Sequence, residues 1–236
     1  MSLKLVLFDL DGTLLPMDQD VFVKAYFGAL AKALAPHGYQ PDTLISAIWA
    51  GTKAMIQNDG SATNEQAFWR TFCSLYGEKA QQDEPLFDAF YHRDFQAVQA
   101  VCGCNADAAE TVRHIRKKGL RVALATNPIF PAIATESRIR WAGLQPSDFE
   151  RYTTYENSRY CKPNLDYYRA ILETLNVTAE ECLMVGNDVG EDMIAEALGM
   201  QVFLLTDCLI NKTNRTVDEF PHGTFANLIT FIDERT

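Results

Sequence analysis

The chain has 236 residues, with 31 acidic and 21 basic side chains and a formal net charge of −10. This length fits one large domain or a core with one insertion, and 47% hydrophobic residues are enough for a sizeable core. The acidic balance disfavours nucleic acid and anionic membranes as partners. The N-terminus does not resemble a signal peptide and no apolar run is long enough for a membrane helix, so we expect a cytoplasmic protein.

The first predicted element is a strand at residues 4–8, a short apolar segment that ends at the polar run Asp-Leu-Asp-Gly-Thr. Such segments are typical of strands buried on both faces of a sheet. Apolar spacing, capping signals and glycine stops then predict helices at residues 20–35, 41–50, 63–76 and 85–99. About 80 helical residues are too many for a connecting loop. We therefore predict a helical domain at residues 17–98, inserted into a core made of residues 1–16 and 99–236.

Strands and helices alternate after this insertion. The predicted helices are residues 107–118, 131–142, 164–175 and 191–198, and the predicted strands are residues 120–126, 182–185 and 201–205. Residues 220–234 could supply one more helix. The alternation predicts right-handed βαβ units, a mostly parallel sheet and an α/β fold class.

Polar side chains follow three of the predicted strands. They are Asp9 and Asp11, Thr126 and Asn127, and Asn187 and Asp188. The carboxyl ends of parallel strands form one edge, where open α/β sheets bind their ligands. We therefore expect these carboxylates, hydroxyl and amides to form one site.

The pair Asp9 and Asp11 has the spacing of residues whose side chains point to one side of a strand. Two carboxylates this close ionise together only with a compensating cation. A hard cation such as Mg²⁺ suits them, with Asp188 as a third oxygen ligand. One carboxylate could then attack phosphorus while the other transfers protons. Gly12 would let the backbone turn sharply and leave amide donors for phosphate oxygens.

Four segments occur in order along the core: VLFDLDGTLL at 6–15, LATN at 124–127, Lys162-Pro163, and VGNDVGEDMIAEALGM at 185–200. Together they resemble the four motifs of the haloacid dehalogenase-like hydrolase superfamily. The helical insertion is similar to the cap of its phosphoglycolate phosphatase and β-phosphoglucomutase branch. The resemblance implies a Rossmann-like, mostly parallel sheet flanked by helices, with an all-helical cap that selects the substrate.

The resemblance also implies roles for the matching residues. Asp9 would be the nucleophile that forms an aspartyl-phosphate, and Asp11 would be the general acid and base. Lys162 would neutralise charge on the nucleophile and the phosphate. Thr126 and the backbone of Asn127 would bind the phosphoryl group.

The same resemblance implies a Mg²⁺ site made of the Asp9 carboxylate, the Asp11 carbonyl and an acid of the fourth motif. That motif departs from the commonest pattern, because Asn187 stands between its glycine and Asp188. We favour Asp188 as the direct ligand, since a charged group helps to hold Mg²⁺, while Asn187 stays open as a neutral alternative. Asp192 lies four residues further and is expected to orient Lys162 or a metal-bound water.

The predicted reaction is the Mg²⁺-dependent hydrolysis of a small phosphorylated metabolite. Asp11 argues against dehalogenases and phosphonate-cleaving relatives, which lack the second aspartate of the first motif. A β-phosphoglucomutase-like phosphomutase stays open, as does a non-catalytic regulatory or binding protein on the same fold. In the cap, Lys53 is a candidate contact to a second anionic group of the substrate. We expect a monomer or a homodimer.

Overall fold

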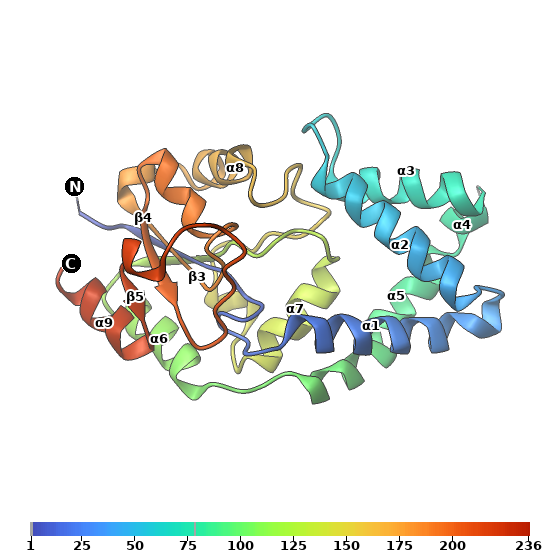
Figure 1. Cartoon of the computed structure of the whole chain (residues 1–236), viewed down its shortest axis with the longest axis horizontal. Coiled ribbons are helices and arrows are strands. Elements are labelled where there is room, and N and C mark those ends of the chain that lie inside the picture. The colour runs from blue at the N-terminus through green and yellow to red at the C-terminus, as the bar shows by residue number, and fades with distance from the viewer. Residues whose placement is uncertain (1, 78) are drawn as a thin grey trace.

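The computed structural model describes residues 2–77 and 79–236, and its centre is a five-stranded parallel sheet (Figure 1). The strands are β1 (Leu5–Phe8), β2 (Arg121–Leu124), β3 (Cys182–Gly186), β4 (Gln201–Leu205) and β5 (His222–Gly223), in the order β2-β1-β3-β4-β5. The four predicted strands and the α/β class are confirmed. The short edge strand β5 was not predicted, because two residues carry no periodic signal.

The register of the sheet aligns the ends of three strands. Phe8 pairs with Leu124 of β2 and with Val185 of β3. The residues that follow these positions therefore leave the sheet at one edge, which brings Asp9 close to the segments after β2 and β3.

Alternate side chains of the strands pack on opposite faces, and helices cover both. Val6, Phe8 and Val185 belong to the apolar cluster on one face, whereas Leu5, Leu7 and Met184 belong to the cluster on the other. The first face is covered by α6 (Ala106–Lys117), α7 (Ala132–Trp141) and α9 (Phe225–Asp233), and the second by α8 (Leu165–Leu175) and the 3-10 helix η5 (Met193–Leu198). The predicted helix at 191–198 is thus shorter and more tightly wound than expected.

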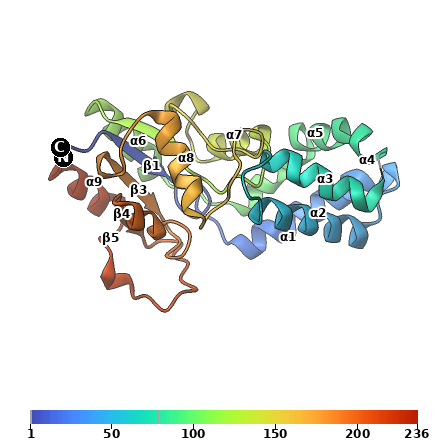
Figure 2. The ribbon, with the colours of Figure 1, turned by 90° about the horizontal axis from the view of Figure 1, so that it is seen from above.

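The insertion is helical, and it extends to one side of the sheet (Figures 1 and 2). It contains α1 (Gln19–Leu34), α2 (Pro41–Ile56), α3 (Asn64–Tyr76), α4 (Lys79–Gln82), α5 (Glu84–His92) and the 3-10 helix η2 (Asp94–Val101). The expected single helix at 85–99 is wrong, because the chain changes from α5 to η2 at Arg93. No helix among residues 2–77 and 79–236 is both long and apolar enough to cross a membrane.

The expected end of the second cap helix at Gly51 is also wrong, because α2 continues to Ile56. A Cβ atom on Gly51 would lie 2.5 Å from Cδ2 of Phe68 in α3. This glycine therefore serves the close approach of two helices rather than a helix stop.

Two chain crossings join the insertion to the core. They run side by side, since Met17 and Cys102 form an isolated bridge and the Gly103 amide donates to the Pro16 carbonyl at 2.7 Å. A separate contact is made by the buried Asn64, whose side chain donates to the Pro128 carbonyl at 3.1 Å. The domain boundaries at 16–17 and 98–99 stay a prediction.

Candidate active site

A buried lysine lies between two carboxylates at the carboxyl edge of the sheet. Asp9 directly follows β1, and its amide donates to the Val185 carbonyl at 2.9 Å. Lys162 is only 2% exposed, and its Nζ donates to Asp9 Oδ1 at 2.8 Å and to Asp192 Oδ1 at 2.6 Å. These three residues lie far apart in the sequence, and the fold brings them together.

Burial and charge act in opposite directions on this group. Burial lowers the pKa of Lys162, but the charges of Asp192 and Asp9 outweigh that effect and hold the pKa well above its ordinary value. Burial raises the pKa of Asp192, while the Lys162 ammonium acts against that rise. Because Lys162 has two carboxylate partners, we assign it as an ammonium ion at neutral pH.

Asp192 also holds the loop of the fourth motif. Its Oδ2 accepts the Asp188 amide at 3.0 Å, while its Oδ1 accepts Lys162. A Cβ atom on Gly186 would lie 2.0 Å from Asp192 Oδ2, so only glycine admits this carboxylate. Asp192 thus contacts Lys162, which is one of the two partners expected for it; its role in orienting Lys162 or a metal-bound water stays a prediction.

The turn after Asp9 is fixed by a hydroxyl and an amide. Thr13 Oγ1 lies 3.2 Å from Asp9 Oδ2 and 2.8 Å from Asn187 Oδ1, and Asn187 Nδ2 donates to the Cys208 carbonyl at 2.6 Å. Gly12 has a φ of +85°, and a Cβ atom there would lie 2.4 Å from Asn187 Nδ2. Asn187 therefore packs against this turn, with both ends of its amide hydrogen-bonded.

The turn at Gly12 is expected to leave amide donors for phosphate oxygens, but the amide of Gly12, itself a candidate donor, is already used. This amide donates to the Leu15 carbonyl at 2.8 Å. Among the hydrogen bonds of the described residues, none uses the amides of Leu10 or Asp11. The sharp turn at Gly12 thus leaves the two preceding amides available as phosphate donors, and not that of the glycine itself.

The oxygen atoms that could hold a cation come from different loops. Asp188 Oδ1 accepts the amides of Gly190 and Glu191, at 2.7 and 2.9 Å. Within the described part of the chain, its Oδ2 and the Asp11 carbonyl have no hydrogen bond. No three His, Cys, Asp or Glu side chains of these residues cluster as a metal site. The unbonded Asp188 Oδ2 and Asp11 carbonyl are oxygen donors of the kind that hard cations such as Mg²⁺ prefer.

The second motif presents a hydroxyl to the same space. The Thr126 carbonyl accepts hydrogen bonds from Thr153 Oγ1 at 2.6 Å and from the Tyr167 hydroxyl at 2.9 Å, which fixes the loop after β2. The Thr126 hydroxyl takes part in none of the hydrogen bonds described for residues 2–77 and 79–236. Asn127 Nδ2 donates to Glu191 Oε2 at 3.1 Å, so Glu191 is a further acid of the site.

The main residue that the sequence did not reveal is Arg138 of α7. It is 1% exposed and forms an ion pair with Asp11 Oδ2. The guanidinium also donates to Thr135 Oγ1 at 3.3 Å and lies 4.4 Å from the ring centroid of Phe130. Burial raises the pKa of Asp11, and Arg138 acts against that rise. The sequence carries no clear signal for this role, because the buried residues of α7 include Thr135, Ser137 and Arg138 beside the apolar ones and form no apolar stripe.

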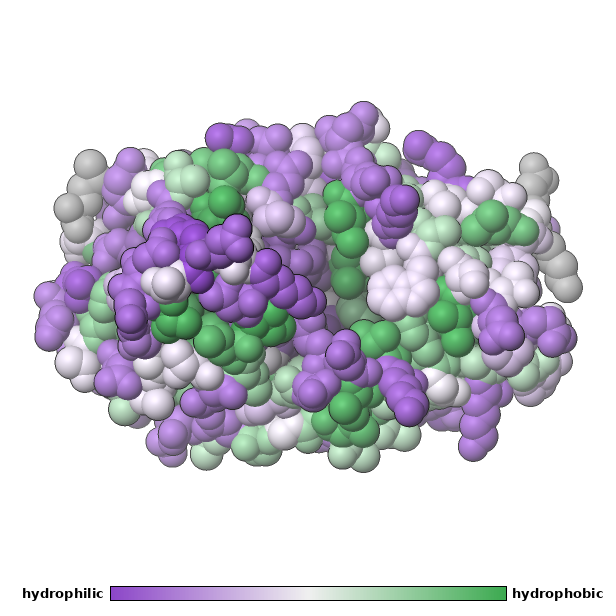
Figure 3. Space-filling model, viewed as in Figure 1, coloured by the Kyte–Doolittle hydropathy of each residue, from purple (hydrophilic) through white to green (hydrophobic). Residues whose placement is uncertain are grey.

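A cleft of about 440 Å³ lies between the sheet edge and the helical insertion. On the core side it is lined by polar residues of the site, namely Asp9, Asp11, Thr126, Asn127, Asn187, Asp188, Glu191 and Asp192. A hollow between the two halves is visible in Figure 3, with apolar residues along its cap side. Trp49, Thr52 and Ile56 of α2 line the cleft, whereas Lys53 is exposed and does not. The structure therefore does not bring Lys53 to the site, because the neighbouring positions on the helix face it instead.

A model of the haloacid dehalogenase-like hydrolase family matches residues 3–199. The chain belongs to this family. The phosphoglycolate phosphatase of Cereibacter sphaeroides is 31% identical to it over 226 residues, which cover 94% of this chain and 93% of the relative. These similarities confirm the family and the branch indicated by the four motifs.

Two solved structures of the family have the same fold. A HAD phosphatase from Thermococcus onnurineus has a TM-score of 0.60 at 19% identity, covering 99% of this chain and 100% of its own. A 2-haloacid dehalogenase from Pseudomonas syringae pv. Tomato DC3000 has a TM-score of 0.63 at 18% identity, covering 99% of both chains. Since the two neighbours are named for different reactions, the fold alone does not select the chemistry.

Proposed function

We propose that this hydrolase is a Mg²⁺-dependent phosphatase that acts on a small phosphomonoester through an aspartyl-phosphate on Asp9. The observation that carries the proposal is the buried ammonium of Lys162, held by Asp9 and Asp192. A fixed positive charge beside the nucleophile stabilises a phosphoryl group as negative charge develops on its oxygens. The similarity to a phosphoglycolate phosphatase supports the same reaction class.

In the proposed first step, a carboxylate oxygen of Asp9 forms a bond to phosphorus while the bond to the alcohol oxygen breaks. The Thr126 hydroxyl and the amides of Leu10 and Asp11 would orient the phosphoryl oxygens. The departing oxygen needs a proton, which Asp11 would donate. In the second step, Asp11 would remove a proton from the water that hydrolyses the phosphoaspartate.

The pairing of Asp11 with Arg138 bears on this second step, because a cation beside a carboxyl group favours its ionised, basic form. Burial of Asp11 favours the protonated form that the first step needs. Burial and Arg138 therefore shift the pKa of Asp11 in opposite directions, which suits a group that must donate a proton in one step and accept one in the next.

Mg²⁺ would be held by the Asp9 carboxylate, the Asp11 carbonyl and Asp188, whose Oδ2 has no hydrogen bond within the described residues. When bound, the ion would supply positive charge against the phosphoryl oxygens. Asn187 is the weaker candidate, because both ends of its amide are already hydrogen-bonded.

Two other functions remain as alternatives. A phosphomutase would use the same groups and would differ in how the cap holds a sugar phosphate. A non-catalytic protein is disfavoured, since Asp9, Asp11 and Lys162 are all present and Lys162 contacts the predicted nucleophile. A cytoplasmic location and a monomeric or homodimeric state stay predictions.

The test is phosphate release from a panel of small phosphomonoesters, with Mg²⁺ or with EDTA, for the wild type and for Asp9→Asn. We expect turnover that needs the metal and is lost in the variant. Acid quenching should also trap phosphate on the wild type and not on Asp9→Asn. Turnover that survives Asp9→Asn would contradict the covalent route. Interconversion of sugar phosphates without phosphate release would favour the phosphomutase.

A further inference from the structure

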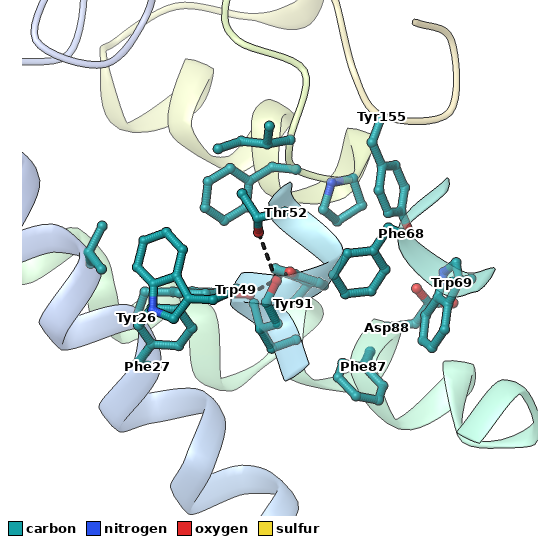
Figure 4. Close-up of a pocket in the computed structure, with 15 residues that line it drawn as sticks. Tyr26, Phe27, Trp49, Thr52, Phe68, Trp69, Phe87, Asp88, Tyr91 and Tyr155 are labelled. Atoms are coloured by element: carbon teal, nitrogen blue, oxygen red, sulfur yellow. Dashed lines mark hydrogen bonds between the residues drawn. The ribbon is translucent and has the colours of Figure 1, made fainter. Parts of the chain in front are cut away.

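A cavity of about 90 Å³ lies between the helical insertion and the core residues Ile129, Phe130, Pro131 and Tyr155, and its walls are mainly aromatic rings (Figure 4). Among its lining residues are Tyr26, Trp49, Phe68, Phe87, Tyr91 and Tyr155. Some of its polar atoms are already partnered. The hydroxyls of Tyr26 and Tyr91 lie 3.0 Å apart, and Thr52 Oγ1 donates to the Ile48 carbonyl at 2.9 Å. These walls suit an apolar group better than a polar one.

This cavity adjoins the catalytic cleft. Val23, Trp49, Thr52, Ile129 and Phe130 line both spaces. A substrate whose phosphate reaches Asp9 could therefore extend its other half along this shared wall.

Two large apolar side chains on the cap side of the cleft are left half exposed. Trp49 is 51% exposed and Ile56 is 50% exposed, and both line the cleft. Both side chains are therefore available to contact an apolar group of a ligand in the cleft. Both residues lie on the same side of α2 as Thr52.

Charge disfavours a second anionic group in this part of the site. Among the described residues, no Lys or Arg of the cap lines the cleft or the cavity. The one charged side chain that lines the cavity within the described part of the chain is Asp88, a carboxylate. Lys212 lines the cleft from the core, and Lys162 is already paired with two carboxylates. A substrate carboxylate would thus meet no cation of the cap.

We propose that the substrate is a phosphomonoester of an uncharged, apolar alcohol, whose aromatic or aliphatic group packs against Trp49 and enters the aromatic cavity. This assignment rests on the proposed phosphatase function. It separates this chain from enzymes whose substrate carries a second acid, as phosphoglycolate does.

The experiment compares benzyl phosphate, ethyl phosphate and 2-phosphoglycolate, all of which release a primary alcohol. For the wild type we expect kcat/KM for benzyl phosphate to exceed each of the other two by about tenfold or more, which corresponds to about 1.4 kcal/mol of binding. Trp49→Ala should lower the ratio of benzyl to ethyl phosphate. Lys53→Ala, one turn away and outside the cleft, is the matched control and should leave the ratio unchanged.

A gain of function tests the charge argument. Ile56→Lys puts a cation on the cap wall at an already exposed position, and it should raise kcat/KM for 2-phosphoglycolate about tenfold while lowering that for benzyl phosphate. Wild-type preference for 2-phosphoglycolate, or no preference at all, would overturn the assignment and leave the phosphatase proposal standing.

Binding without turnover separates the two proposals. Calorimetric titration of Asp9→Asn with the three esters should give a Kd for benzyl phosphate about tenfold below the others. If the wild type hydrolyses none of them but this preference is found, the phosphatase proposal fails and the apolar site stands. Equal affinities would refute the apolar site whatever the activity.

Discussion

The two sides of the cleft differ in chemistry. The edge of the sheet contributes mainly charged and polar side chains, and the cap contributes mainly apolar ones. At the sheet edge, ionised side chains are buried in contact with their counter-charges, as Lys162 is with Asp9 and Asp192, and Arg138 with Asp11. The cap offers mainly aromatic rings and aliphatic chains, with few hydrogen bonds among them, such as that between the hydroxyls of Tyr26 and Tyr91. Stabilising a charged transition state needs charged groups at fixed positions. Binding an apolar group needs only enough apolar surface of a complementary shape.

This contrast has an energetic consequence. Removing one partner of a buried ion pair leaves a charge without compensation, which costs about 3–5 kcal/mol. Trimming a partly exposed apolar side chain removes much less, because water already reaches it. Substitutions at the sheet edge should therefore lower the free energy of unfolding more than substitutions in the cap do. Four substitutions test this difference, in order of decreasing effect.

Lys162→Met should have the largest effect. It leaves Asp9 and Asp192 buried without their shared cation, and we expect a loss of about 3–5 kcal/mol in the free energy of unfolding, with no detectable turnover. Urea denaturation of the variant, beside Lys212→Met at an exposed position of the cleft, measures the difference. A loss below about 1 kcal/mol would mean that the pair contributes little.

The same variant should depend on pH in a defined direction. Burial raises the pKa of Asp192 to about 7 even with Lys162 present. A carboxyl group whose pKa is raised in the folded state binds its proton more tightly there, so it stabilises the fold at low pH and loses that contribution as the pH rises through the folded-state pKa. The loss of stability in Lys162→Met should therefore be smaller at pH 5 than at pH 8. A pH-independent loss would contradict this assignment.

Arg138→Leu should come next, since it leaves the partly buried Asp11 without its partner. We expect a loss of about 3 kcal/mol, at the low end for a buried pair. Combining it with Asp11→Leu should recover part of that loss, and a double-mutant cycle measures the coupling. Additive effects of the two substitutions would show that the contact is not an energetic pair.

Gly186→Ala should have an intermediate effect at the sheet edge. Its Cβ atom would lie 2.0 Å from Asp192 Oδ2, so the carboxylate must move away from Lys162, at a cost of about 1–3 kcal/mol and with lower turnover. The matched change in the cap is Gly28→Ala in α1, where an added Cβ atom would meet no atom within 4 Å beyond its chain neighbours and the backbone of its own helix. Gly28→Ala should stabilise the protein by about 0.5–1 kcal/mol. Thermal unfolding of both variants gives the comparison, and a Gly186→Ala protein as stable as the wild type would contradict it.

Trp49→Ala should have the smallest effect on stability. The side chain is half exposed, so we expect a loss of no more than about 1 kcal/mol in urea denaturation. A loss as large as that of Arg138→Leu would show that substitutions in the cap are not less costly than those at the sheet edge.

Four of the five strands and the motif residues could be predicted from the sequence. Strands β1 to β4 were predictable because a parallel sheet covered on both faces needs unbroken apolar segments, and Asp9 and Asp11 could be placed at a strand end. The roles of Thr126, Lys162 and Asp188 came from the ordered resemblance to a family, since a single threonine or lysine carries no such information.

The tertiary structure alone decided which of these residues meet, and how. Arg138 is not recognisable as a partner of Asp11, because the two are 127 positions apart and the contact depends on how α7 packs. Gly51 has the same appearance in the sequence as a helix stop, yet it admits Phe68 from a neighbouring helix. The lining of the cleft likewise includes Thr52 and not Lys53, because the direction of a helix face is set by packing between elements distant in the chain.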